Sequence, residues 1–181
     1  RYDPTAINTD DTTMPPNLEH LMGTDILGRD IFSRVLYGAR ISLQLGLVSV
    51  TIATVVGGTL GLISGYREDW VDLLIMRGVD ILLAFPSFLL ALTLVFMLGP
   101  SLFNAMVAVG ISSIPGYTRT VRGSVLSAKQ NEYVTAARSI GCSEVRIMIR
   151  HILPNVLAPL IVIATLGIPW AILTAASLSF L

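Results

Sequence analysis

Long stretches of the sequence carry no Asp, Glu, Lys or Arg. These uncharged stretches are residues 41–66, 81–118 and 151–181. Because a helix that crosses a lipid bilayer needs about 20 mostly apolar residues, each stretch is long enough to span. The longest one contains Gly99-Pro100 near its middle, a turn signal that divides it into two helices. We therefore predict membrane-spanning helices at about residues 41–65, 73–98, 102–121 and 154–178.

The composition agrees with a membrane protein. Hydrophobic residues make up 53% of the 181 residues and charged residues 13%, whereas a soluble domain carries about 25% charged residues. The mean hydropathy is +0.73. High hydrophobicity excludes a disordered chain, and the balance of 12 basic and 12 acidic residues argues against a nucleic-acid partner. The predicted fold class is an all-α membrane protein, a polytopic transmembrane helix bundle.

The ends and the loops indicate how this bundle is placed. The sequence begins with Arg1 rather than Met and stops inside an apolar segment, so we expect an internal piece of a longer chain. Basic residues outnumber acidic ones in the loop 122–152, which the positive-inside rule puts in the cytoplasm together with Cys142. Residues 1–40 then form an extracytoplasmic segment, and residues 41–181 form the transmembrane domain.

Small residues recur at every fourth position of the first span, so they share one face of a helix. They are Ser49, Ala53, Gly57, Gly61 and Gly65. Such a ridge lets another helix backbone approach closely, and we expect it to pack against a helix rather than lipid. It is not a nucleotide site, because the only lysine, Lys129, follows an alanine and cannot belong to a phosphate-binding Gly-Lys-Ser/Thr loop.

Few ionisable residues are candidates for chemistry. Arg77 and Asp80 lie at the start of the second span, where their side chains reach the headgroups. In the N-terminal segment, Asp25/Arg29 and Asp30/Arg34 have the i,i+4 spacing of ion pairs on an interfacial helix that leads into the first span. We expect no catalytic, cofactor-binding or metal-binding residue, since the two histidines are far apart and a lone cysteine cannot build a zinc site.

The loop after the third span carries two apolar stripes with helical spacing. They are Tyr133, Ala136, Ala137 and Ile140, and then Val145, Met148, Ile149 and Ile152. Gly141 separates them, so we predict two short amphipathic helices joined by a glycine turn and ending at Leu153-Pro154. The pattern alone is compatible with helices lying on the membrane surface and with helices docking in a groove of another protein.

This loop resembles the signature loop of binding-protein-dependent ABC importer permeases. The family motif is a Glu-Ala-Ala triplet, three residues, a glycine, nine residues and Ile-x-Leu-Pro. Ala136, Ala137, Gly141 and Leu153-Pro154 fit at that spacing, whereas Thr135 replaces the usual Glu and His151 the usual Ile. The segments 23–30, 37–42, 84–86 and 176–181 resemble the C-type subunit of the dipeptide/oligopeptide/nickel permeases.

The resemblance implies the type I ABC importer permease fold with six spans, of which this chain holds about four. The loop would be a coupling helix that docks on an ATP-binding subunit, with Ala136 and Ala137 on the docking face. The implied coupling residues are Glu132, Tyr133, Thr135, Ala136, Ala137, Arg138, Gly141, Arg146, Leu153 and Pro154.

The resemblance also implies the partners. They are two ATP-binding subunits, which bind the ATP and Mg that this chain does not, a second homologous permease subunit and an extracytoplasmic substrate-binding protein. The substrate would be a short peptide or related small solute, imported across the cytoplasmic (inner) membrane of a bacterium or archaeon. Two other classes stay open from the residues alone, a gradient-driven transporter or channel and a membrane enzyme. The predicted spans carry no charged residue at mid-membrane, which argues against the gradient-driven transporter.

Overall fold

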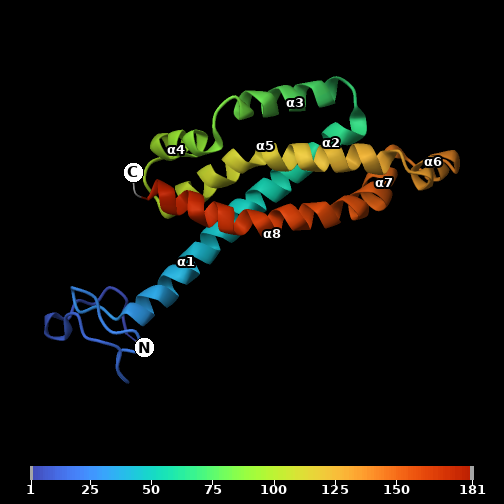
Figure 1. Ribbon diagram of the computed structural model, residues 1–181. Helices are drawn as coiled ribbons and strands as arrows, with labels where there is room; N and C mark the ends of the chain where they lie inside the picture. The colour runs from blue at the N-terminus through green and yellow to red at the C-terminus, as the bar shows by residue number, and fades with distance from the viewer. Residues whose placement is uncertain (1, 180–181) are drawn as a thin grey trace. The chain divides into compact units, whose positions relative to one another are not determined.

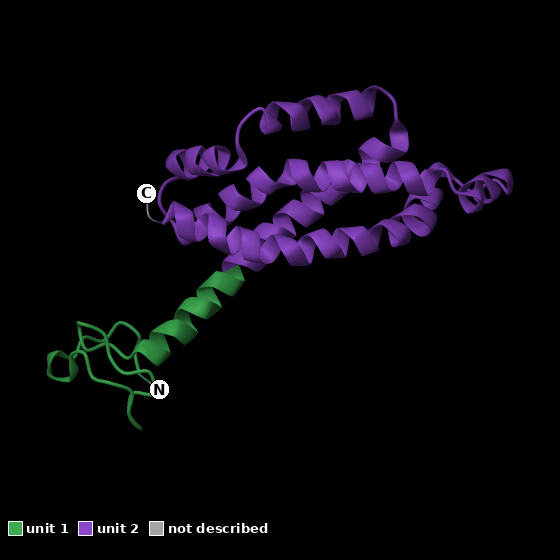
Figure 2. Cartoon of the chain, viewed as in Figure 1, with its two compact units in different colours: residues 1–44 green, residues 45–181 purple. Residues whose placement is uncertain are grey.

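The computed structural model describes residues 2–179. The chain divides between Gln44 and Leu45 into two compact units (Figure 2). The sequence placed this division at residues 40 and 41, and the structure places it inside a helix. Residue 1 and residues 180–181, which the predicted domains and the closing motif include, lie outside the described residues.

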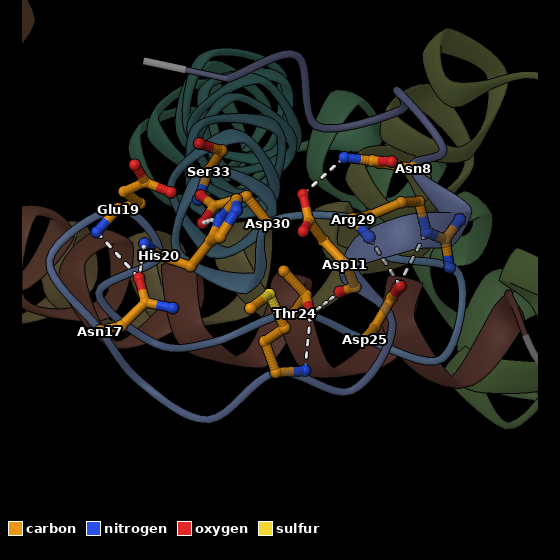
Figure 3. A network of polar contacts seen from close by, with 11 residues as sticks. Asn8, Asp11, Asn17, Glu19, His20, Thr24, Asp25, Arg29, Asp30 and Ser33 are labelled. Atoms are coloured by element: carbon orange, nitrogen blue, oxygen red, sulfur yellow. Dashed lines mark hydrogen bonds and ion pairs between the residues drawn. The ribbon is translucent and has the colours of Figure 1, made fainter.

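The described residues of the first unit contain a turn of 3-10 helix, Thr9–Asp11, loops held together by polar contacts (Figure 3), and the beginning of the first long helix. Asp25 accepts from Arg29 Nε at 2.8 Å, as its spacing predicts, and also from Arg34 Nη1 at 2.9 Å. The second predicted pair is wrong, because the Asp30 carboxylate lies 2.8 Å from His20 Nδ1 instead of pairing with Arg34.

Asp30 also begins the first long helix, since its Oδ2 accepts from the main-chain N–H of Ser33 at 2.8 Å. Its side chain is 3% exposed. Burial raises the pKa of Asp30, but hydrogen bonds from Ser33 and His20 outweigh it and leave the pKa below the usual value. The charged carboxylate is therefore the form that the folded unit favours.

The first predicted span belongs to one continuous helix from Ile31 to Arg67. It consists of α1 (Ile31–Ile52), a π-helical turn (Ala53–Gly57) and α2 (Gly58–Arg67) (Figure 1). Residues 31–40, which belong to the interfacial helix that we expect to lead into the span, form the beginning of α1. The helix ends where Glu68 adopts a left-handed conformation, φ 51°.

The second predicted span, 73–98, is not one helix. It is broken into α3 (Trp70–Leu83) and α4 (Ser87–Leu98), which meet at an angle of 87°. The break falls at Pro86, which lacks the N–H needed to continue the helix and disfavours helical geometry at the residue before it.

The third predicted span extends beyond its expected end. Helix α5 runs from Leu102 to Lys129, and Ser101 caps it by accepting from the Asn104 main-chain N–H at 3.0 Å. Among the described residues, two helices are long and apolar enough to cross a membrane, or up to three if the bent α3–α4 pair counts as one. Helix α5 is not one of them, because Ser112, Ser113 and Arg119 lower its hydropathy.

The signature loop is a helix, a turn and the start of the next long helix. Helix α6 covers Glu132–Ser139, and α7 (Glu144–Ile147) follows the turn. The predicted second short helix is wrong as a separate element, because α7 continues through a π-helical turn (Met148–Ile152) into α8 (Leu153–Leu178). Pro154 lies in the first turn of α8, directly after the π-helical turn, and the helix continues through it.

Helix α5 is the centre of the second unit and packs against α2, α3, α4 and α8. In Figure 1 it runs beside α8, and α6 extends past the ends of both. The larger apolar cluster joins α2, α5, α6, α7 and α8, with fully buried Val125, Ile147 and Ile152 at its centre. The base of the predicted coupling loop is thus built into the core of the unit.

Candidate functional site

Helix α6 has one face inside the protein and one outside. Val134 and Ala137 are 1% and 4% exposed and pack in the cluster with Val125 and Ile147. The expectation that both alanines face outward is therefore wrong for Ala137, which contacts its own chain. Ala136 is exposed.

The outer face of α6 carries a stripe of apolar residues beside the exposed polar residues Thr135 and Ser139. Tyr133 is 38% exposed, Ala136 is exposed and Ile140 is 81% exposed, at the i, i+3 and i+7 spacing of one helix face. We call these three residues the outer stripe. Beyond the turn, Val145 and Ile149 are also exposed, at 62% and 53%. Apolar side chains at the tip of a folded unit are typical of a surface that another protein covers.

The remaining implied coupling residues surround this face. Glu132 lies in the first turn of α6, where a carboxylate is favoured by the helix dipole. Thr135 is exposed, and its carbonyl oxygen accepts from Ser139 Oγ at 3.0 Å. Arg146 is exposed on α7, while Leu153 is half-buried at the start of α8.

The turn after α6 requires its glycine. Gly141 has φ +80°, a left-handed conformation that side chains disfavour, although a Cβ there would meet nothing within 4 Å. The main-chain N–H of Cys142 donates to the Ala137 carbonyl oxygen at 3.1 Å and closes the end of the helix. The conformation of the backbone, and not a lack of space, therefore explains Gly141.

Polar contacts join α6 and α7 to α2 and α5. The Tyr66 hydroxyl donates to Glu144, which also accepts from Arg138 Nε at 3.2 Å and Nη2 at 3.1 Å. This hydrogen bonding to a carboxylate raises the pKa of the Arg138 guanidinium. Lys129 Nζ donates to the Tyr66 carbonyl oxygen at 2.7 Å. Sequence reasoning missed Tyr66, since nothing in the pattern links it to residues so far along the chain.

The small-residue ridge lies along α5. A Cβ added to Gly57, Gly61 or Gly65 would come within 2.5–2.8 Å of atoms of α5. Ala53 is fully buried, and Ser49 Oγ donates to the Met106 carbonyl oxygen at 2.8 Å. Helices α2 and α5 are therefore in backbone contact, which any larger side chain would prevent.

Two ion pairs connect α3 to α5. Arg122 donates to both carboxylate oxygens of Asp72, at 2.8 and 2.7 Å, and Arg119 Nη2 lies 2.7 Å from Asp80 Oδ1. The sequence suggested that Asp80 reaches toward headgroups, and the structure gives it a partner on another helix. No group of three or more His, Cys, Asp or Glu side chains that could hold a metal ion occurs in residues 2–179.

A cavity of about 570 Å³ opens between α4, α5 and α8. Its walls carry hydroxyl groups and aromatic rings and no charged side chain. They include Ser112, Ser113, Thr120, Tyr117, Trp170 and Thr174. Among these, the Tyr117 hydroxyl donates to the Ile163 carbonyl oxygen at 3.1 Å, across from α5 to α8.

Long apolar helices with a helix–glycine–helix loop at one end are the arrangement that we expect of a transport permease from the sequence motifs. The chain belongs to the family of binding-protein-dependent transport system inner membrane components, whose sequence profile matches residues 57–181. Members of this family are permease components and not enzymes. The expected membership is thus confirmed.

The relatives narrow this class. The chain is 54% identical over 166 residues to the dipeptide transport system permease protein of Alkalihalophilus pseudofirmus, covering 92% of this chain and 55% of the relative. It is 49% identical, over the same shares, to glutathione transport system permease proteins of Pectobacterium atrosepticum and Escherichia coli. These relatives agree with the resemblance of the sequence motifs to the dipeptide permease family. The chain spans about half the length of the relatives that it matches.

Proposed function

We propose that this chain forms part of the translocation path of an ATP-driven importer for short peptides or a related small solute. Its relatives are named for dipeptide and glutathione transport, and both solutes contain peptide bonds. The hydroxyl oxygens of the cavity between α4, α5 and α8 can accept hydrogen bonds from the N–H groups of such solutes, while the hydroxyl hydrogens of Ser113, Thr120 and Thr174 are donated to main-chain carbonyl oxygens of their own helices. The cavity lining has no charge that would hold a solute tightly, which suits a path that must release its cargo.

The same proposal gives α6 the role of a coupling helix. The observation that carries it is the outer stripe, Tyr133, Ala136 and Ile140, on a helix whose opposite face is fixed in the core by Val134 and Ala137. A helix anchored in this way moves together with the bundle when a partner pushes on it. The partner that pushes on α6 is an ATP-binding subunit. The complete importer has two such subunits, which bind the ATP and Mg, and a second permease subunit beside this one in the inner membrane. An extracytoplasmic binding protein delivers the solute.

The test exchanges exposed isoleucines for aspartate in the full-length permease, expressed with its ATP-binding subunits. Ile140→Asp should lose the ATP-binding subunits on purification, because a carboxylate buried without a partner costs several kcal/mol. The isolated permease should keep its melting temperature, since an 81%-exposed side chain contributes little to folding. Ile26→Asp is the matched control, 78% exposed in the first unit, and should retain the subunits.

Transport is measured on the same preparations in proteoliposomes, with labelled dialanine and labelled glutathione as probes. Uptake that depends on ATP and on the binding protein supports the proposal, and Ile140→Asp should abolish it. If Ile140→Asp keeps both the ATP-binding subunits and full uptake, α6 is not the coupling helix.

A further inference from the structure

Helix α6 approaches some of its neighbouring helices through its main chain and others only through side chains. Its main chain approaches α7 and the turn Met148–Ile152. Toward α2 there is instead a cavity of about 600 Å³, whose lining includes Ile63, Arg67 and Met148. Side chains must therefore carry any direct connection from α6 to α2.

Three side chains make this connection, and we call them the Tyr66 link: Tyr66, Arg138 and Glu144. Glu144 is the shared acceptor, because it binds the Tyr66 hydroxyl from α2 and the Arg138 guanidinium from α6. Tyr66 is 7% exposed and belongs to the core cluster, whereas Arg138 and Glu144 are 50% and 57% exposed. The link thus runs from the solvent-facing end of α6 to a residue fixed in the core.

Tyr66 is held from a second side as well. Lys129, at the end of α5, donates to its carbonyl oxygen at 2.7 Å, and the ammonium group lies 5.5 Å from the centre of its ring. The ring and the main chain of Tyr66 are therefore fixed by α5 and the core, and only its hydroxyl reaches toward α7. A displacement of α6 and α7 acts on α2 through that hydroxyl.

The Tyr66 link contributes too little to the stability of the fold for stabilisation to be its main role, so we consider a role in positioning α6 relative to α2. Ion pairs between side chains as exposed as Arg138 and Glu144 contribute little to stability, because water screens the charges. The apolar anchor of α6, Val134 and Ala137, exists without them. The position of the link at the junction of four helices makes it relevant to motion, since coupling travels through contacts that join rigid elements.

We propose that Tyr66 is a positioning residue that transmits movement of α6 to α2 through Glu144. This inference rests on the proposed function, in which an ATP-binding subunit moves α6. Because α2 continues the helix that begins at Ile31, a rotation or shift at Tyr66 is passed into a membrane-crossing element.

The test is Tyr66→Phe in the complete transporter reconstituted in proteoliposomes, with labelled dialanine as the probe. The variant keeps the ring in the core and beneath Lys129 and removes only the hydroxyl. It should keep its ATP-binding subunits and melt within about 2–4 °C of the parent. The uptake of dialanine per ATP hydrolysed should fall about 2- to 30-fold. Tyr37→Phe, at an exposed tyrosine of the first unit, should leave this ratio unchanged.

A double-substitution cycle checks that the hydroxyl acts through the carboxylate. Glu144→Ala should lower the ratio as well, and Tyr66→Phe combined with Glu144→Ala should be no worse than Glu144→Ala alone. An unchanged ratio in Tyr66→Phe overturns the inference, and so does a loss that only follows the amount of assembled complex. If the parent itself takes up neither dialanine nor glutathione, or if Ile140→Asp retains full function, the proposed function fails instead.

Discussion

The contact between α2 and α5 can be tested by adding a single methyl group at Gly61. A Cβ there would lie 2.5 Å from the Thr118 carbonyl oxygen and 2.8 Å from Val121 Cβ. The first distance is about 0.9 Å shorter than an ordinary van der Waals contact of 3.4 Å. Because the obstructing atom belongs to the backbone of α5, no side-chain rotation relieves the overlap and the two helices must separate.

The magnitude follows from two opposing terms. Overpacking of a well-filled core costs about 1–3 kcal/mol. Replacing glycine by alanine inside a helix returns about 1 kcal/mol through helix propensity. Gly116→Ala in α5 isolates the second term, because a Cβ at Gly116 meets nothing within 4 Å. The difference between Gly61→Ala and Gly116→Ala is therefore the overlap itself, about 1–3 kcal/mol.

The assay is thermal unfolding of the purified full-length protein in detergent, followed by circular dichroism. At about 2–4 °C per kcal/mol for a chain of this size, Gly61→Ala should melt about 2–12 °C below Gly116→Ala. Equal or reversed melting temperatures would refute the backbone contact between α2 and α5.

Substitutions at two further positions test local conformation and charge. Gly141→Val should speed amide hydrogen exchange in α6, because the φ of +80° costs a β-branched residue about 1–2 kcal/mol. Gly141→Asn should have a smaller effect, since asparagine tolerates this conformation better. Equal effects of the two substitutions would contradict the role of φ. The lowered pKa of Asp30 means that its contribution to the stability of the first unit is present above the unfolded pKa of about 3.9 and disappears as the pH falls through the lower folded value. Amide hydrogen exchange in the first unit, corrected for intrinsic rates, should therefore become faster at low pH in the parent. Asp30→Asn should be less protected from exchange at neutral pH, and its exchange should depend less on pH. If the exchange of Asp30→Asn depends on pH as steeply as that of the parent, another group causes the pH dependence.

Much of the fold and of the loop could be predicted from local pattern. The uncharged runs lead to long helices, and the last one was predicted at 154–178 against an observed α8 of Leu153–Leu178. The four-residue spacing of Gly57, Gly61 and Gly65 puts them on one helix face whatever surrounds it. The left-handed turn at Gly141 follows from a glycine between two amphipathic stripes. Each of these features depends on residues within a few turns of one another.

The relative placement of helices was decided only by the tertiary structure. Periodicity assigns Ala136 and Ala137 to one stripe, but packing against Val125 and Ile147 buries only Ala137. The helix pattern cannot distinguish an inner apolar face from an outer one, because both are apolar here and only the position of α5 selects between them.

The tertiary structure also decided which side chains pair with the charged residues. The i,i+4 spacing suggested Arg34 for Asp30, yet the fold of the first unit brings His20 to its carboxylate. Tyr66 and Glu144, 78 residues apart, meet because the end of α2 lies beside the start of α7. The sequence by itself determines which residues form helices and which faces are apolar, since these depend on local backbone geometry and solvation. Which distant side chain satisfies a given polar group depends on three-dimensional packing, and only the folded structure supplies it.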